Sequence, residues 1–228
     1  MTDTFYIGAY WKNRKEVLEN IVIPTLNTLT ELRGIDDQFL NLYELGMSRK
    51  QALEREFIPS SEYIERLYRH GLKKKDLDQD GYSKIGFSLW LWSGHKDEES
   101  SQVSFGVGKG SERLTNVCLI RIPTEGIAKE RLLQLDKVKQ IIEVLIKNWN
   151  PDKVILNSKE LSTALNSTNE IGWVTYIKRT KGISKANGKI VHEPNYYGGD
   201  LFYLKTNSGL TYDYSLIDEY QSFKKQIS

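Results

Sequence analysis

The chain has 228 residues, of which 39% are hydrophobic and 27% are charged, and its formal net charge at pH 7 is +2. This balance excludes an intrinsically disordered chain, and no apolar run is long enough to form a membrane-spanning helix. The first residues lack the basic-then-apolar pattern of a secretory signal, and the single cysteine, Cys118, excludes an internal disulfide. These features favour a cytoplasmic globular protein.

The first third of the chain predicts one strand followed by helices. The aromatic run 4–11 predicts the strand, and residues 15–35 carry apolar side chains at helical spacing, with Pro24 inside this helix. Asp36 and Ser48 suit the N-cap positions of two further helices, because their side-chain oxygens accept hydrogen bonds from free backbone N–H groups. The shorter helices are predicted at residues 36–46, 48–57 and 60–75.

Asp76, Asp78 and Asp80 form an Asp-x-Asp-x-Asp-Gly sequence, which resembles the start of an EF-hand calcium loop. The closing position of such a loop holds a bidentate glutamate, but here it is a phenylalanine, and the residues that follow alternate like a strand. The pattern therefore favours a polar turn without metal. A carboxylate from the following turn, such as Glu98 or Glu99, could still complete a calcium site of another kind.

Three strands connected by short turns are predicted between residues 85 and 123. In the first, Phe87 and Leu89 share one face, while Trp90 and Trp92 share the other. Runs 102–108 and 116–123 follow after connections too short for a helical crossover, which indicates an antiparallel meander. We interpret Trp90 as packed against the sheet, because large aromatic side chains are mostly buried.

The pattern changes after Pro123, where residues 125–149 predict one long amphipathic helix. Together these elements predict an α+β fold, a mainly antiparallel sheet with flanking helices, in one domain spanning 1–228 with a soft subdivision near residue 123. The remaining elements are predicted as strands at 150–156, 172–179 and 200–206, a helix at 157–167 and a closing helix at 211–228.

No residue pattern indicates an active site, a cofactor site or a zinc site. The histidines form no zinc motif, and Cys118 lies in an apolar run, where a buried structural thiol is expected. The segment 178–189 is basic and has no acidic residue, so it could contact phosphates. A solvated loop is the favoured interpretation, and the alternative is a nucleic-acid-binding protein or an enzyme that uses this segment.

A series of short features along nearly the whole chain resembles the bacterial polymorphic-toxin immunity proteins of immunity family fifty-two. These features are Tyr10-Trp11, Gly46 before SRKQAL, His70-Gly71, Trp90 and Trp92, Pro123, Pro151-Asp152 and IGWVTYI. The resemblance implies an antidote without enzyme activity that binds a cognate toxin, typically a restriction-endonuclease-like nuclease. A neighbouring family associated with type VI secretion shares a similar Gly-Trp-x-Thr-Tyr segment. The slightly positive charge departs from the acidic charge that often matches a basic nuclease cleft.

Two predicted turns carry residue types that suit a protein interface. The turn 95–101 is acidic, and the loop 193–200 holds two tyrosines beside two glycines. Acidic groups speed association with a basic partner, and exposed tyrosines serve as anchors. The alternative, that both are ordinary solvent-facing turns, stays open. The residues predicted to bind the toxin are Asp97, Glu98, Glu99, Tyr196, Tyr197 and Asp200.

Overall fold

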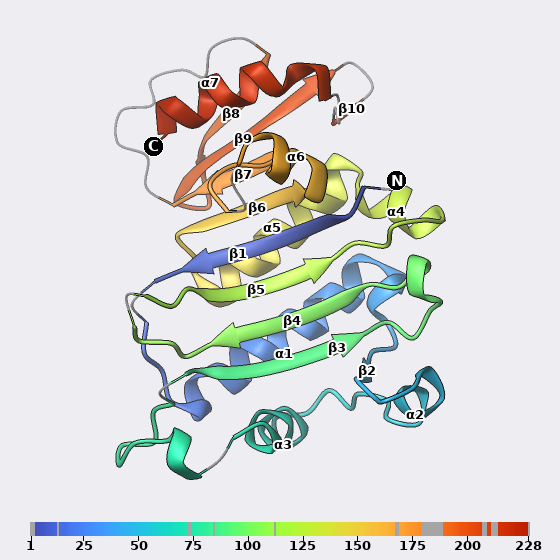
Figure 1. The fold of residues 1–228 in the computed structure, drawn as a ribbon, viewed down its shortest axis with the longest axis vertical. Helices are drawn as coiled ribbons and strands as arrows, with labels where there is room; N and C mark the ends of the chain where they lie inside the picture. Colours follow the sequence, from blue (N-terminus) through green and yellow to red (C-terminus); the bar gives the residue numbers. More distant parts are fainter. Residues whose placement is uncertain are drawn as a thin grey trace.

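The computed structural model describes residues 3–12, 14–72, 74–83, 85–111, 113–166, 169–178, 189–206, 209–210 and 214–227. Within this part of the chain, one sheet of ten strands is flanked by helices (Figure 1). Every ladder between neighbouring strands is antiparallel. The α+β fold with a mainly antiparallel sheet, predicted from the sequence, is confirmed.

The sheet is built around β1, which pairs with β5 on one side and with β6 on the other. The strand order is β10-β9-β7-β6-β1-β5-β4-β3-β2, and β8 also pairs with β9. The predicted meander is confirmed, because β3, β4 and β5 are neighbours in this order. The strands are β1 (Phe5–Trp11), β2 (Tyr43–Glu44), β3 (Phe87–Trp92), β4 (Gln102–Val107), β5 (Asn116–Arg121), β6 (Lys153–Ser158), β7 (Val174–Ile177), β8 (Ile190–Tyr196), β9 (Gly199–Thr206) and β10 (Gly209–Leu210).

The helices begin largely where the sequence places their caps. The side chain of Ser48 accepts a hydrogen bond from the backbone N–H of Gln51, and Ser60 accepts one from Tyr63. No helix among the described residues combines the length and apolar composition needed to cross a membrane. The helices are α1 (Leu18–Ile35), α2 (Arg49–Leu53), α3 (Ser61–His70), α4 (Ile127–Leu132), α5 (Leu135–Trp149), α6 (Lys159–Ala164) and α7 (Ile217–Ile227).

The main core lies between the sheet and the helices α1 and α5, which lie behind the sheet in Figure 1. Trp149 of α5 stacks on Trp11 of β1 with ring centroids 5.4 Å apart, and it also contacts Phe105 of β4. Its indole N–H donates to the Thr28 hydroxyl of α1 over 2.9 Å. Trp149 therefore joins both helices to the centre of the sheet. Cys118 is fully buried in this core, as predicted, and burial raises the pKa of its thiol.

Among the described helices, α6 and α7 cover the opposite face of the sheet, at the end that holds β7 and β9 (Figure 1). Phe223 of α7 packs on Phe202 of β9, with ring centroids 4.9 Å apart, and Tyr220 meets the edge of Trp173. Phe202 lies opposite Thr175, and Thr175 lies opposite Ile155, so these residues share one face of β9, β7 and β6. The helix α7 thus covers the face opposite to α5.

The structure corrects three predicted elements. The helix expected at 36–46 is a single 3-10 turn, Asp37–Phe39, because the chain must return to pair Tyr43 with Trp92 in the sheet. The helix expected at 125–149 breaks between α4 and α5, and this break lets Leu132 and Val138 both face the core.

The third correction concerns the loop predicted at 193–200. Its first half belongs to strand β8, which the sequence reading missed because Pro194 breaks the expected strand pattern. The β8–β9 ladder is irregular between Glu193 and Tyr196, next to the position where proline supplies no N–H.

Asp36 links α1 to α4 through a nearly buried carboxylate. It accepts hydrogen bonds from the Arg131 guanidinium at 2.5 and 2.6 Å and from the backbone N–H of Gln38 at 2.9 Å. Burial by itself would raise the pKa of Asp36, but the bonds from Arg131 and Gln38 outweigh it and hold the pKa below its ordinary value. The carboxylate therefore contributes stability while it is ionised.

Replacing Arg131 with methionine is expected to destabilise the protein more at pH 7 than at pH 3. At pH 7 the variant leaves the Asp36 carboxylate without its main partner, which costs about 1–3 kcal/mol. Because the folded-state pKa of Asp36 is lowered, this contribution is present above the unfolded pKa and is lost as the pH falls through the folded pKa. Urea unfolding of both proteins between pH 7 and pH 3 measures the difference.

The control for this experiment is Arg69→Met, which removes an exposed ion pair to Glu65 on α3. Such pairs contribute little, so the control should change the free energy of unfolding by less than about 0.5 kcal/mol. If Arg131→Met lowers the free energy of unfolding by the same amount at every pH, the loss does not come from the ion pair with Asp36.

Candidate partner-binding surface

One face of the sheet has no described helix over β1, β3, β4 and β5 (Figure 1). Side chains alternate between the two faces of a strand, so the residues between the core positions point outward here. We call this surface the open face. Its positions are Tyr6, Gly8, Tyr10, Ser88, Trp90, Trp92, Gln102, Ser104, Gly106, Val117, Leu119 and Arg121.

The register of the strands sets large side chains beside small ones on the open face. Trp90 lies opposite Ser104, Ser104 opposite Leu119, and Leu119 opposite Gly8. Trp90 is less buried than its interpretation as a sheet-packing residue implies, because 50% of the residue is exposed. No described helix lies over this side of β3, so half of Trp90 stays in contact with solvent (Figure 1).

Tyr10 lies across the neighbouring glycine instead of pointing into solvent. A Cβ atom placed on Gly8 would be 2.4 Å from the Tyr10 hydroxyl oxygen, so only glycine leaves room for this arrangement. Burial raises the pKa of Tyr10, and nearby Tyr6 raises it further. The phenol therefore stays uncharged and adds an aromatic surface with a polar edge.

Three cations, Arg121, Lys109 and Lys153, lie on or beside the open face, and the exposed Glu98 and Glu99 lie in the turn at one end of it. Arg121 is exposed and lies opposite Tyr6 and Gln102. The Lys109 ammonium lies over Gly106 and donates to the Thr115 carbonyl, and Lys153 lies opposite Tyr10.

Burial lowers the pKa of both Lys109 and Lys153. Among the ion pairs of the described residues, none includes Arg121, Lys109 or Lys153. No position of the open face is Asp or Glu. The face therefore combines aromatic side chains with cations, of which Arg121 and Lys109 have no ion pair in the described chain, while Lys153 is attracted by the nearby Glu170.

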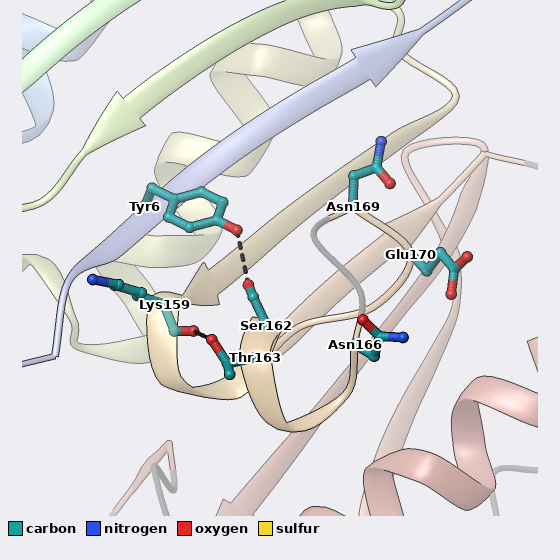
Figure 2. Close-up of a pocket in the computed structure, with 7 residues that line it drawn as sticks. All are labelled: Tyr6, Lys159, Ser162, Thr163, Asn166, Asn169 and Glu170. Carbon is teal, nitrogen blue, oxygen red and sulfur yellow. Dashed lines mark hydrogen bonds between the residues drawn. The ribbon is translucent and has the colours of Figure 1, made fainter.

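A polar hollow of about 660 Å³ adjoins the open face at Tyr6 (Figure 2). The Tyr6 hydroxyl bonds the Ser162 hydroxyl of α6 over 3.0 Å, and this contact closes one wall. The lining side chains offer hydroxyl, amide, ammonium and carboxylate groups without any arrangement typical of catalysis. The remaining lining residues are Lys159, Thr163, Asn166, Asn169 and Glu170.

The acidic turn predicted to bind the toxin connects β3 to β4. Its backbone is fixed, because the carbonyl of Glu98 accepts from the N–H groups of Thr124 and Glu125, and the carbonyl of Glu99 accepts from the Gln38 amide. The side chains of Glu98 and Glu99 are exposed. Asp97 belongs to the same 3-10 turn, Asp97–Glu99, and its side chain lies outside what the structure describes.

The predicted tyrosines lie at the β8–β9 hairpin, and the structure distinguishes them. The Tyr196 hydroxyl donates to Glu143 of α5 over 2.7 Å, whereas 57% of Tyr197 is exposed. The Asp200 carboxylate accepts from the backbone N–H of Asn195 and lies 3.3 Å from Nε2 of His192. Tyr196 and Asp200 therefore hold the hairpin, and Tyr197 remains available for contact.

The structure does not bring the two predicted loops together. The acidic turn follows Trp92 at one end of the strands, next to the row that contains Gln102 and Arg121. Asp200 belongs to the row at the opposite end, with Ile177. Six strand spacings, or roughly 29 Å at ~4.8 Å each, also separate β3 from β9.

The Asp-rich segment forms a turn whose carboxylate has local partners. Oδ1 of Asp78 accepts from the backbone N–H groups of Asp80 and Tyr82, and Oδ2 accepts from the Lys15 ammonium at 2.9 Å. This bond to Lys15 lowers the pKa of Asp78. Across the described ranges, no three His, Cys, Asp or Glu side chains, Asp76 included, are grouped to hold a metal ion.

The basic segment falls mostly outside the described residues, which omit 179–188. The nucleic-acid alternative built on it therefore stays a prediction. Sequence reasoning missed Val117, Leu119 and Arg121 as surface residues. Their alternation with the apolar Cys118 and Ile120 was the available signal, but it does not tell which face of the strand is covered.

Comparisons with known proteins place this fold and surface in context. No match is found among curated protein sequences. Among solved structures, the Pseudomonas aeruginosa T6SS protein PA0821 has a similar fold, with a TM-score of 0.53 and 11% identity over 99% of this chain and 76% of its own. The family model described as Immunity protein 52 matches residues 3–190. Because this match spans most of the sequence, the chain belongs to the immunity protein 52 family.

Proposed function

We propose that this protein binds a cognate secreted bacterial toxin and neutralises it stoichiometrically, without catalysis. The observation that carries the proposal is the family match over residues 3–190. The open face supports it, since aromatic side chains there are available for contact with a protein.

The finer proposal is that the toxin is a restriction-endonuclease-like nuclease delivered by type VI secretion. The resemblance of the sequence to immunity family fifty-two supports the nuclease, and the T6SS name of the similar structure supports the delivery route. A nuclease damages nucleic acid inside the recipient cell, so the antidote would act in the cytoplasm.

Co-expression with the toxin encoded beside this gene tests the function. We expect cell growth to be restored and the two proteins to copurify in equal amounts. As a control, the toxin inactivated at its own active site should copurify equally well, because binding does not need its activity. Protection without any association of the two proteins would contradict the proposal.

The six loop residues predicted from the sequence remain proposed contacts. A standard interface buries about 800 Å² on each partner, roughly 28 Å across if it is square. The acidic turn and the Tyr197 hairpin are roughly 29 Å apart across the strands and also lie at opposite ends of them, so a compact interface would include one of them and not both. Variants of each loop are therefore included in the binding experiment below, where they test whether the toxin contacts that loop.

A further inference from the structure

We propose that the open face is the toxin-docking surface and that the toxin presents an acidic patch to it. This inference rests on the proposed function and adds the place of contact and the charge of the partner. It places the contact on the strands β1, β3, β4 and β5, away from the helices that build the core.

The apolar groups of the open face are arranged like the centre of a protein interface. Trp90 of β3 is half exposed, and Leu119 and Val117 lie part-buried two strands away on β5. Small residues between them, such as Ser104, leave the surface flat enough to receive side chains from a partner. Interfaces typically place a few such aromatic anchors inside a polar rim.

The charges of the open face specify the partner. Arg121 is exposed without an ion pair, and burial lowers the pKa of Lys109, which has only a carbonyl as hydrogen-bond partner in the described chain. A second cationic surface would be repelled, whereas carboxylates would pair with these groups and speed association. The phosphate-binding cleft of a nuclease is itself cationic, so the acidic patch must lie elsewhere on such a toxin.

A protein suits this surface better than a nucleic acid. Non-specific binding to DNA depends almost entirely on Lys and Arg contacts with the phosphates. The open face supplies Arg121, with Lys109 and Lys153 beside it, while its centre holds the aliphatic Val117 and Leu119. Aliphatic side chains in the middle of a surface favour contact with apolar side chains of another protein.

The test measures binding kinetics with the inactivated toxin encoded beside this gene as the probe, at several salt concentrations. Trp90→Ala is expected to weaken Kd at least thirtyfold, mainly through faster dissociation, as for an interface hot spot. Arg121→Glu is expected to slow association about tenfold or more at low salt and to flatten its salt dependence.

The matched controls are Ile23→Ala and Lys147→Glu. Ile23 is 51% exposed on α1, and Lys147 is exposed on α5, so both lie in the helix layer on the other side of the sheet. Each should change Kd by less than about threefold, as most residues outside hot spots do. Circular dichroism and thermal melting of every variant confirm that the fold is kept.

The outcomes separate the two proposals. If the wild-type protein does not bind the toxin, the proposed function is wrong, and the docking surface is wrong with it. If the wild-type protein binds but Trp90→Ala and Arg121→Glu bind equally well, only the docking surface is wrong. A loss confined to Glu98→Ala/Glu99→Ala or to Tyr197→Ala would also overturn it in favour of a loop.

Two further results would overturn the inference. Association of the wild-type protein that becomes faster with added salt would show a cationic partner surface. Tight binding of labelled DNA or RNA by the free protein, lost in Trp90→Ala and steeply weakened by salt, would assign the open face to nucleic acid.

Discussion

Replacing Trp149 with alanine is expected to lower the free energy of unfolding by about 3–5 kcal/mol, the usual loss for a buried tryptophan. Trp149 is 2% exposed and contacts the rings of Trp11 and Phe105 across β1 and β4. Its removal leaves a cavity where the two helices α1 and α5 meet the sheet, and it leaves the Thr28 hydroxyl without the indole N–H. Urea unfolding followed by circular dichroism measures the change.

Trp149→Phe separates the two contributions. Phenylalanine keeps an aromatic ring against Trp11 but cannot donate to Thr28, so a smaller loss of about 1–3 kcal/mol is expected. Equal losses in both variants would mean that the hydrogen bond, and not the packing, carries the stability. A loss below about 1 kcal/mol in Trp149→Ala would contradict the role given to this residue.

Replacing Gly172 with alanine is expected to cost about 3 kcal/mol or more, or to prevent folding. A Cβ atom at this position would lie 2.2 Å from the carbonyl oxygen of Leu156 and 2.4 Å from a methyl carbon of Ile155. The carbonyl belongs to strand β6 and cannot move without disturbing its ladders to β1 and β7. Overpacking against backbone is therefore more damaging than the usual 1–3 kcal/mol for an added methylene.

The matched control is Gly34→Ala in the last turn of α1. No atom lies within 4 Å of a Cβ placed on Gly34, and the residue is helical. Alanine should therefore stabilise the helix by about 0.5–1 kcal/mol. Thermal melting of both variants compares them directly, and similar melting temperatures for Gly172→Ala and Gly34→Ala would contradict the steric argument.

Local patterns predicted the elements that depend on neighbouring residues. Ser48 caps its helix as expected, because capping needs only an oxygen within reach of the next N–H groups. The alternation in β3 correctly separated Phe87 and Leu89 from Trp90 and Trp92. Period-two alternation follows from strand geometry, so it is visible without knowledge of the fold.

The features that the sequence reading missed depend on contacts between distant segments. The alternation of side chains along the strand predicted which residues share a face with Trp90. It did not predict that the two large helices, α1 and α5, cover the other face. The position of Asp200 at the opposite end of the strands from Glu98 follows from the ladder β6-β7-β9, which no local pattern encodes. Turn composition alone therefore could not tell that the two predicted loops lie far apart.

The central position of β1 has a consequence for protein synthesis. The strand leaves the ribosome before its partners, β5 and β6, which come from residues 116–121 and 153–158. At about 5–20 residues per second, the β5 edge of β1 stays unpaired for roughly 5–22 s and the β6 edge for roughly 7–30 s while the intervening chain is translated. Unpaired apolar strands associate readily with other chains. We therefore expect the nascent chain to need a chaperone. The amount of available chaperone would then set how soon a newly made molecule reaches its folded state.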